Sequence, residues 1–293
     1  MENCPIQRLT EKKLTLLQNF LQSNSLPFTD MEIDKHLFFG VFDKDELIGS
    51  VGIELYNQSG LFRSLAVKSE YQKNGLGKRL HDHIISYCLQ NGVKTLFLLT
   101  TTASSYFEKM GWSKIQRNET PEQILQSEEF ASLCPSTAVC MTFQVYSDNI
   151  DYTGKIFASG FNCAQSVFVP VAVDKGISAS AAFKLSTGFG AGMVYRGETC
   201  GAITGAMMAI GLVHGRFQAE NTDSRDKTYK LINKLYDDFS AKHGAILCKE
   251  LLNADITNPE EVKRIGMAGA FTTLCPKFVK DAAIITDMLA REQ

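Results

Sequence analysis

The 293-residue chain is 44% hydrophobic and 21% charged, a balance typical of a globular protein with room for two domains. Its formal net charge of -2 argues against nucleic acid and against an anionic membrane as partners. The start, MENCPIQRLTEKK, lacks the apolar core of a signal peptide, and the longest apolar run, Cys200 to Val213, is too short for a membrane span. We therefore expect a cytoplasmic protein whose eight cysteines are thiols rather than a disulfide scaffold.

The first half alternates between strand and helix patterns. Three extended apolar segments separated by turns precede a helix, and a buried strand follows it, which predicts a parallel strand pair with that helix as the crossover. The expected order is a strand (5–9), a helix (10–22), three antiparallel strands (37–42, 47–56 and 61–67), a helix (79–89), a strand (95–100) and a short helix (103–110).

The turn between the third antiparallel strand and the next helix has a composition that suits phosphate. It reads Gln72-Lys73-Asn74-Gly75-Leu76-Gly77-Lys78. Two glycines let backbone N–H groups point into one concavity at a helix N-terminus, where the helix dipole also favours an anion. The segment has neither the Gly-Lys-Ser/Thr ending of a Walker A loop nor the Gly-x-Gly-x-x-Gly of a Rossmann fingerprint. An ordinary strand-to-helix turn is the alternative.

The Gln-x-x-Gly-x-Gly spacing, after a strand that ends in Leu-x-Val, resembles the acetyl-CoA pyrophosphate loop of the GNAT N-acetyltransferases. A second GNAT-like segment, Tyr106-Phe107 followed by Gly111-Trp112, comes in the expected order. The resemblance implies an α/β GNAT fold for residues 1–146, with a mixed, mostly antiparallel sheet and flanking helices. It also implies acetyl-CoA as the cofactor, bound by Leu65, Ala66, Val67, Gln72, Lys73, Asn74, Gly75, Leu76, Gly77 and Lys78.

Within that family, residues 60–67, 98–103 and 130–138 resemble the arsenic-resistance N-acetyltransferases, a subfamily named mainly from gene neighbourhood. This suggests a small-molecule amine, such as an amino-bearing organoarsenical, as the acetyl acceptor. By resemblance, Tyr106 would protonate the departing thiolate, with a core aromatic as the alternative. Glu54 is a candidate base, or else a solvated strand residue. Arg63 lies among apolar neighbours and would hold a substrate carboxylate, or equally a structural ion pair.

The second half, residues 147–293, has a helical pattern punctuated by glycines. Cys163, Cys200 and Cys275 each follow a capping signal, so we expect them at helix N-termini, whereas Cys248 is expected in mid-helix. A thiol at a helix N-terminus has a lowered pKa, which suits a redox or metal-binding role. Buried small hydrophobic side chains are the alternative.

These four cysteines, with the segment Cys200-Gly201-Ala202-Ile203-Thr204-Gly205, resemble the redox-active family named for its C-GCAxxG-C-C pattern. The order Cys-Gly-Ala at the second cysteine departs from the named Gly-Cys-Ala. Thiolate clusters also bind zinc, iron–sulfur clusters or other soft metals, and trivalent arsenic is thiophilic, so a metal, an Fe–S cluster or arsenite remains open as a ligand.

We therefore expect an acetyl-CoA-dependent N-acetyltransferase that acts on a small-molecule amine and is fused to a mainly helical thiol domain. The competing hypothesis is a CoA-binding sensor without turnover, fused to a thiol redox or metal-binding module. Whether the chain forms a homodimer is left open.

Overall fold

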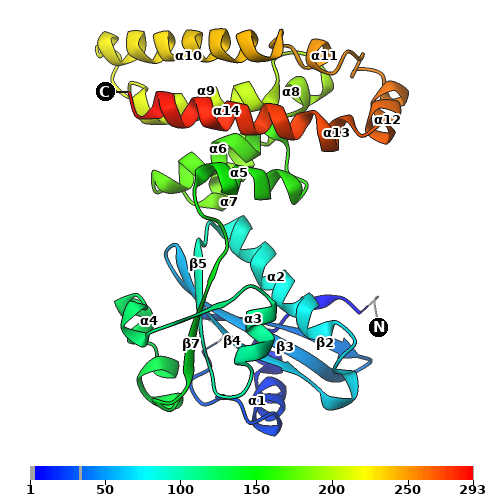
Figure 1. Cartoon of the computed structure of the whole chain (residues 1–293), viewed down its shortest axis with the longest axis vertical. Helices are drawn as coiled ribbons and strands as arrows, with labels where there is room; N and C mark the ends of the chain where they lie inside the picture. The colour runs from blue at the N-terminus through cyan, green and yellow to red at the C-terminus, as the bar shows by residue number, and fades with distance from the viewer. Residues whose placement is uncertain (1–3, 33–34, 293) are drawn as a thin grey trace. The chain divides into compact units, whose positions relative to one another are not determined.

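A computed structural model describes residues 4–32 and 35–292 of the chain. The chain folds into two compact units (Figure 1). One unit comprises Met1–Leu89 with Val93–Val145, and the other comprises Gln90–Gly92 with Tyr146–Gln293. Across the described residues, no helix combines the length and the apolar character needed to cross a membrane.

The first unit is built on one mixed sheet. In the described residues it has seven strands in the order β1-β2-β3-β4-β5-β7-β6. Their bounds are β1 (Ile6–Arg8), β2 (His36–Asp43), β3 (Glu46–Tyr56), β4 (Ser59–Val67), β5 (Thr95–Thr100), β6 (Ser113–Ile115) and β7 (Val139–Gln144). The strands β4 and β5 pair in parallel, and the other neighbours pair antiparallel. The predicted mixed, mostly antiparallel sheet is confirmed, although the sequence did not predict β6 and β7.

The central strands β4 and β5 part after a short paired segment. Their pairing runs from Ser59 and Thr95 to Leu61 and Phe97. Further along β4 the register with β3 shifts, and Ser64 has a φ of 57°, as expected for a bulge that bends the strand. The separated ends of both strands then line one cavity.

The helices of this unit are α1 (Leu14–Ser23), α2 (Leu76–Asn91), α3 (Ser104–Lys109) and α4 (Glu122–Leu125). The helix α2 begins three residues before the predicted start, so that Gly77 and Lys78 of the predicted turn lie in its first turn. Its Leu80 side chain lies against Gly49 of β3, where a Cβ atom would come within 3.0 Å of it. The missing side chain at Gly49 thus lets α2 lie close to the sheet, which fixes the position of the turn at the helix N-terminus.

The second unit is helical, as predicted. Its helices are α5 (Asn149–Ala158), α6 (Cys163–Asp174), α7 (Ala179–Ser186), α8 (Ala191–Tyr195), α9 (Gly201–His214), α10 (Thr222–His243), α11 (Cys248–Leu251), α12 (Pro259–Met267), α13 (Ala270–Thr273) and α14 (Cys275–Ala290). Within this unit, α9 and α14 lie between α10 and the pair α5–α6 (Figure 1).

Glycine allows a close contact between two helices of the second unit. A Cβ atom on Gly205 of α9 would lie 2.5 Å from the backbone oxygen of Ala164 in α6. Such a distance is far inside van der Waals contact, so a larger residue would force the two helices apart.

Candidate active site and thiol cluster

A cavity of about 490 Å³ opens beside the N-terminus of α2. The turn before α2 bends through Gly75, whose φ of 78° is readily adopted only by glycine, while nothing lies within 4 Å of a Cβ built there. At Gly77 the constraint is space, because a Cβ would lie 2.7 Å from the hydroxyl of Tyr106. The lining includes Gln72, Lys73, Gly75, Gly77, Lys78 and Tyr106. Unpaired N–H groups at a helix start and two lysines make this cavity suitable for phosphate.

Tyr106 projects from α3 and is 40% exposed. Partial burial, together with the charge of Asp82, raises the pKa of Tyr106 above its usual value. The phenol is therefore protonated at neutral pH, as a proton donor must be. Its hydroxyl lies against the glycine turn, on the wall of the cavity.

A second cavity, of about 430 Å³, extends between the separated ends of β4 and β5. It shares the lining residues Leu65, Val67, Gln72, Ala103 and Phe107 with the first cavity, so the two cavities are adjacent. From this shared wall it reaches Arg63, Glu129 and Cys134. The first cavity suits a phosphate-bearing cofactor, and the second has room for a small acceptor beside the end of β4.

Arg63 forms the centre of a buried ionic group with Asp30, Glu54 and Glu129, here named the Arg63 group. Its Nη1 and Nη2 atoms donate to Asp30 at 2.6 and 2.7 Å, and Nη1 also contacts Glu54. Its Nε lies 2.9 Å from Oε2 of Glu129, and its side chain is 0% exposed. Because the protein's own carboxylates surround this guanidinium, the expected role in holding a substrate carboxylate does not fit, and the ion-pair alternative does.

Glu54 is not placed to act as the predicted base. It is buried rather than solvated, its Oε1 contacts Arg63, and its Oε2 accepts a hydrogen bond of 2.7 Å from the Tyr56 hydroxyl. The residues that line the second cavity in the described chain do not include it. Both of its oxygens are thus occupied, away from the acceptor.

Glu129 is the functional candidate that the sequence analysis missed. It begins a π-helical turn, Glu129–Leu133, and lines the second cavity. Burial raises the pKa of its carboxyl to about 7, against the opposing effect of Arg63. The available signal was Arg63 itself, since a buried cation requires nearby carboxylates, but the sequence did not show which ones.

The four cysteines of the second unit come together, and the three that were predicted at helix starts are found there. Cys163 and Cys275 are the first residues of α6 and α14, and Cys200 is the N-cap of α9. Cys248 is also at a helix start, of α11, so its predicted mid-helix position is wrong. The reason is a bridge between Thr199 and Leu247, which holds the chain extended up to Cys248.

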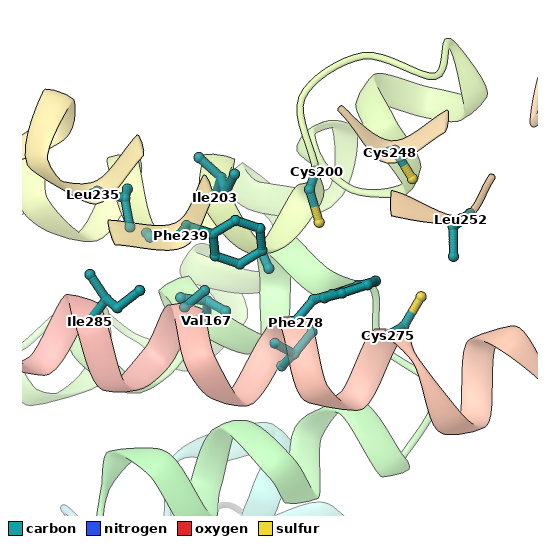
Figure 2. Close-up of a cluster of buried hydrophobic side chains, with 14 of the residues drawn as sticks. Val167, Cys200, Ile203, Leu235, Phe239, Cys248, Leu252, Cys275, Phe278 and Ile285 are labelled. Carbon is teal, nitrogen blue, oxygen red and sulfur yellow. The ribbon is translucent and has the colours of Figure 1, made fainter. Parts of the chain in front are cut away.

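These four side chains form what we name the thiol cluster. The Cys163 and Cys275 thiols are in hydrogen-bond contact. Figure 2 shows the sulfur atoms of Cys200, Cys248 and Cys275 facing a common space beside Phe278. As placed in the described residues, no three His, Cys, Asp or Glu side chains are close enough to hold a metal ion.

The predicted lowering of the thiol pKa is wrong for Cys163 and Cys200. Contact with Cys275, followed by burial, raises the pKa of Cys163. Burial raises the pKa of both Cys200 and Cys248 to about 12. Backbone N–H groups at the helix starts, such as those of Ala202 and Ile203 on Cys200, lower the pKa, but burial without a nearby cation outweighs them.

A strained turn supports the thiol cluster. The five residues of α8, Ala191–Tyr195, all have φ between 51° and 67°, which makes α8 a left-handed turn. Such a conformation costs roughly 1–2 kcal/mol for each residue with a side chain. It brings the N–H of Ala191 to the thiol of Cys163. It also brings Gly192 so close to Cys248 that a Cβ would lie 2.6 Å from the Cys248 Cβ. The sequence did not predict this turn.

Two family models match the chain, one within each unit. Residues 8–112 match the family model described as "Acetyltransferase (GNAT) family". Residues 161–289 match the family model described as "Putative redox-active protein (C_GCAxxG_C_C)". The chain carries a GNAT acetyltransferase domain followed by a C_GCAxxG_C_C domain. The first of these domains contains the two adjacent cavities, and the second contains the thiol cluster.

Individual relatives of the GNAT domain are distant. An uncharacterized N-acetyltransferase of Chlorobaculum tepidum is 30% identical over 104 residues, which are 35% of this chain and 64% of that protein. N-acetylglutamate synthase from Neisseria gonorrhoeae, solved with coenzyme A and L-arginine, is 19% identical with a TM-score of 0.42, covering 49% of this chain and 33% of that one. The ribosomal-protein-S18-alanine N-acetyltransferase of Escherichia coli is 19% identical with a TM-score of 0.38. The match covers 48% of this chain and 93% of that one.

Proposed function

We propose that the GNAT domain transfers the acetyl group of acetyl-CoA to the amine of a small molecule. The observation that carries this proposal is the shared wall of the two cavities. One ends at a glycine turn that suits a pyrophosphate, and the other holds a buried carboxylate, Glu129, beside the end of β4. The thioester would lie at their shared wall, within reach of Tyr106 as proton donor to the departing thiolate.

The glycine turn provides the test of cofactor binding. A Gly75→Val variant places a β-branched residue at a φ of 78°, so the turn must change and its N–H groups leave the phosphate. Loss of two charge-assisted hydrogen bonds of about 1.5 kcal/mol each predicts roughly 100-fold weaker acetyl-CoA binding by titration calorimetry.

A matched control is Gly176→Val in the other unit, where φ is 82° and the space is equally open. This variant should bind acetyl-CoA like the wild type. Equal affinity of Gly75→Val and Gly176→Val would exclude the turn as the pyrophosphate site.

We further propose that the second unit acts through its thiols as a dithiol–disulfide couple. The contact between Cys163 and Cys275 favours this role over a preformed metal site. In the reaction, the two thiols lose two protons and two electrons as their S–S bond forms, and a small-molecule disulfide accepts both and becomes two thiols. Mass spectrometry after exposure to oxidised glutathione should show a loss of two hydrogens, linking Cys163 to Cys275.

Binding of trivalent arsenic by the same thiols is the second candidate, because the thiols cluster and arsenic is thiophilic. Equilibrium dialysis would then show that the protein takes up arsenite. The uptake should disappear in the double variant Cys163→Ser/Cys275→Ser and persist in the control variant Cys4→Ser. Uptake unchanged in the double variant would exclude the cluster. Acetylation assays over a panel of amines test the two remaining hypotheses. Turnover of an amino-bearing organoarsenical would support that acceptor, and binding of CoA without any turnover would support a sensor.

A further inference from the structure

We propose that Glu129 accepts the proton of the acceptor ammonium, and that the Arg63 group selects cationic amines that carry no carboxylate. The proposal rests on the proposed acetyl transfer. It adds the proton acceptor and the charge class of the substrate.

The geometry of Glu129 supports this role. The residue is 5% exposed and lines the second cavity. One oxygen, Oε2, lies 2.9 Å from Nε of Arg63, but the N–H there is not aligned for a hydrogen bond. The other oxygen, Oε1, accepts no hydrogen bond from any residue in the ranges 4–32 and 35–292. A buried carboxylate therefore keeps one oxygen free for a ligand in the cavity.

The charges around Glu129 are unbalanced. Arg63 supplies one positive charge and faces three carboxylates, of Asp30, Glu54 and Glu129. The thiol of Cys134 also faces this set, and burial raises its pKa to about 11, so it is neutral at pH 7. His36 lies 3.7 Å from Glu54, but burial lowers its pKa, so it is neutral at pH 7. Arg117, the other cation near Cys134, donates to the backbone oxygens of Phe130 and Pro135. In a site that is largely shielded from water, this excess of negative charge attracts an ammonium and repels a carboxylate.

The other ionisable groups nearby are less suited to the proton transfer. Glu54 has both oxygens occupied, as described above, and Tyr106 is protonated at neutral pH. The carboxyl of Glu129 has a pKa of about 7, so half of it is ionised at neutral pH and ready to accept a proton. A base with a pKa near the working pH is the most effective one.

The proposed step balances as follows. The ammonium gives one proton to Oε1 of Glu129 and becomes a neutral amine, whose lone pair attacks the thioester carbon. The C–N bond forms and the C–S bond breaks, the CoA thiolate takes a proton from Tyr106, and the nitrogen releases its second proton. The products are the acetamide, CoA and one proton, which leaves to solvent as the side chains return to their starting states.

Acceptor binding tests the selection without requiring turnover. Calorimetry on the full chain with CoA would compare 1,4-diaminobutane with ornithine, which differ by one carboxylate. We expect the diamine to bind at least about tenfold more tightly, and Glu129→Gln to remove most of this difference. Equal binding of the two amines, or tighter binding of ornithine, would overturn the selection.

Kinetics test the proton transfer. In Glu129→Gln, kcat with the diamine at pH 7 should fall by about 100-fold or more, and the rise of kcat through pH 7 should disappear. Glu129→Asp should recover part of the rate and part of its rise through pH 7. The adjacent, exposed Glu128 gives a matched control, and Glu128→Gln should behave like the wild type. Thermal unfolding checks that each variant is folded.

The outcomes separate the two proposals. A folded Glu129→Gln variant with wild-type kcat and pH profile would overturn the role of Glu129 while leaving acetyl transfer intact. Absence of turnover in the wild type, with the diamine still bound selectively, would overturn acetyl transfer and the base role together and leave the selection standing.

Discussion

The two units both bury reactive side chains, but they surround them differently. In the GNAT domain, Glu129 is buried next to Arg63, and the nearby cation limits the rise of its pKa to about 7. In the helical domain, burial raises the pKa values of Cys200 and Cys248 to about 12. Burial thus raises the pKa of both kinds of acid, but only the carboxyl, whose ordinary pKa is 4.5 against 9 for a thiol, reaches a value at which it titrates at neutral pH.

Removal of the cation should have the largest effect. An Arg63→Met variant leaves three buried carboxylates without their partner, which should lower the free energy of unfolding by about 3–5 kcal/mol in urea denaturation. Lys68, which forms exposed ion pairs with Glu46 and Glu70, is the matched control. Its methionine variant should unfold at nearly the wild-type urea concentration. Equal losses in the two variants would contradict the importance of burial.

The thiols provide the next test. At pH 8, a pKa of about 12 instead of an ordinary value near 9 reduces the thiolate fraction about 1000-fold, and burial adds to this protection. Time-resolved mass spectrometry with iodoacetamide should therefore find Cys4, which is half-buried, modified long before Cys200 and Cys248. Comparable rates at all three cysteines would contradict the protection of Cys200 and Cys248 by burial.

The pH dependence of stability tests Glu129. Its folded pKa of about 7 lies above the ordinary 4.5, so folding favours the protonated form. The contribution to stability is complete below about pH 4.5 and is lost as the pH rises to about 7, by about 3 kcal/mol. Relative to Glu129→Gln, the wild type should therefore lose stability over this window in urea titrations. A constant difference between the two proteins would contradict the raised pKa.

The smallest expected effect concerns the packing that positions the thiols. Gly205→Ala introduces a Cβ 2.5 Å from the Ala164 oxygen and should cost about 1–3 kcal/mol of stability. In the same helix, a Cβ at Gly211 meets nothing within 4 Å, so Gly211→Ala should stabilise the protein by up to about 1 kcal/mol. A lower unfolding temperature for Gly205→Ala together with a higher one for Gly211→Ala would confirm the close contact. Changes of the same sign in the two variants would contradict it.

The features that depend on local sequence could be predicted. The glycine turn, the strands around it and three of the four cysteine positions follow from patterns a few residues long. Glu129 could not be identified in this way, because it meets Arg63 only in the folded chain and looks like a surface charge beside Glu128. The left-handed turn at Ala191–Tyr195 is likewise imposed by its surroundings, since its side chains do not favour positive φ.

The most direct test of the proposed reaction is the mass of the product formed from acetyl-CoA and 1,4-diaminobutane. Mass spectrometry is preferable to thiol reagents, because the protein's own cysteines would react with them. We predict steady formation of the monoacetylated diamine together with CoA, and its loss in Gly75→Val but not in Gly176→Val. Tight binding of acetyl-CoA without an acetylated product from this diamine or any other small amine would contradict the proposed acetyl transfer.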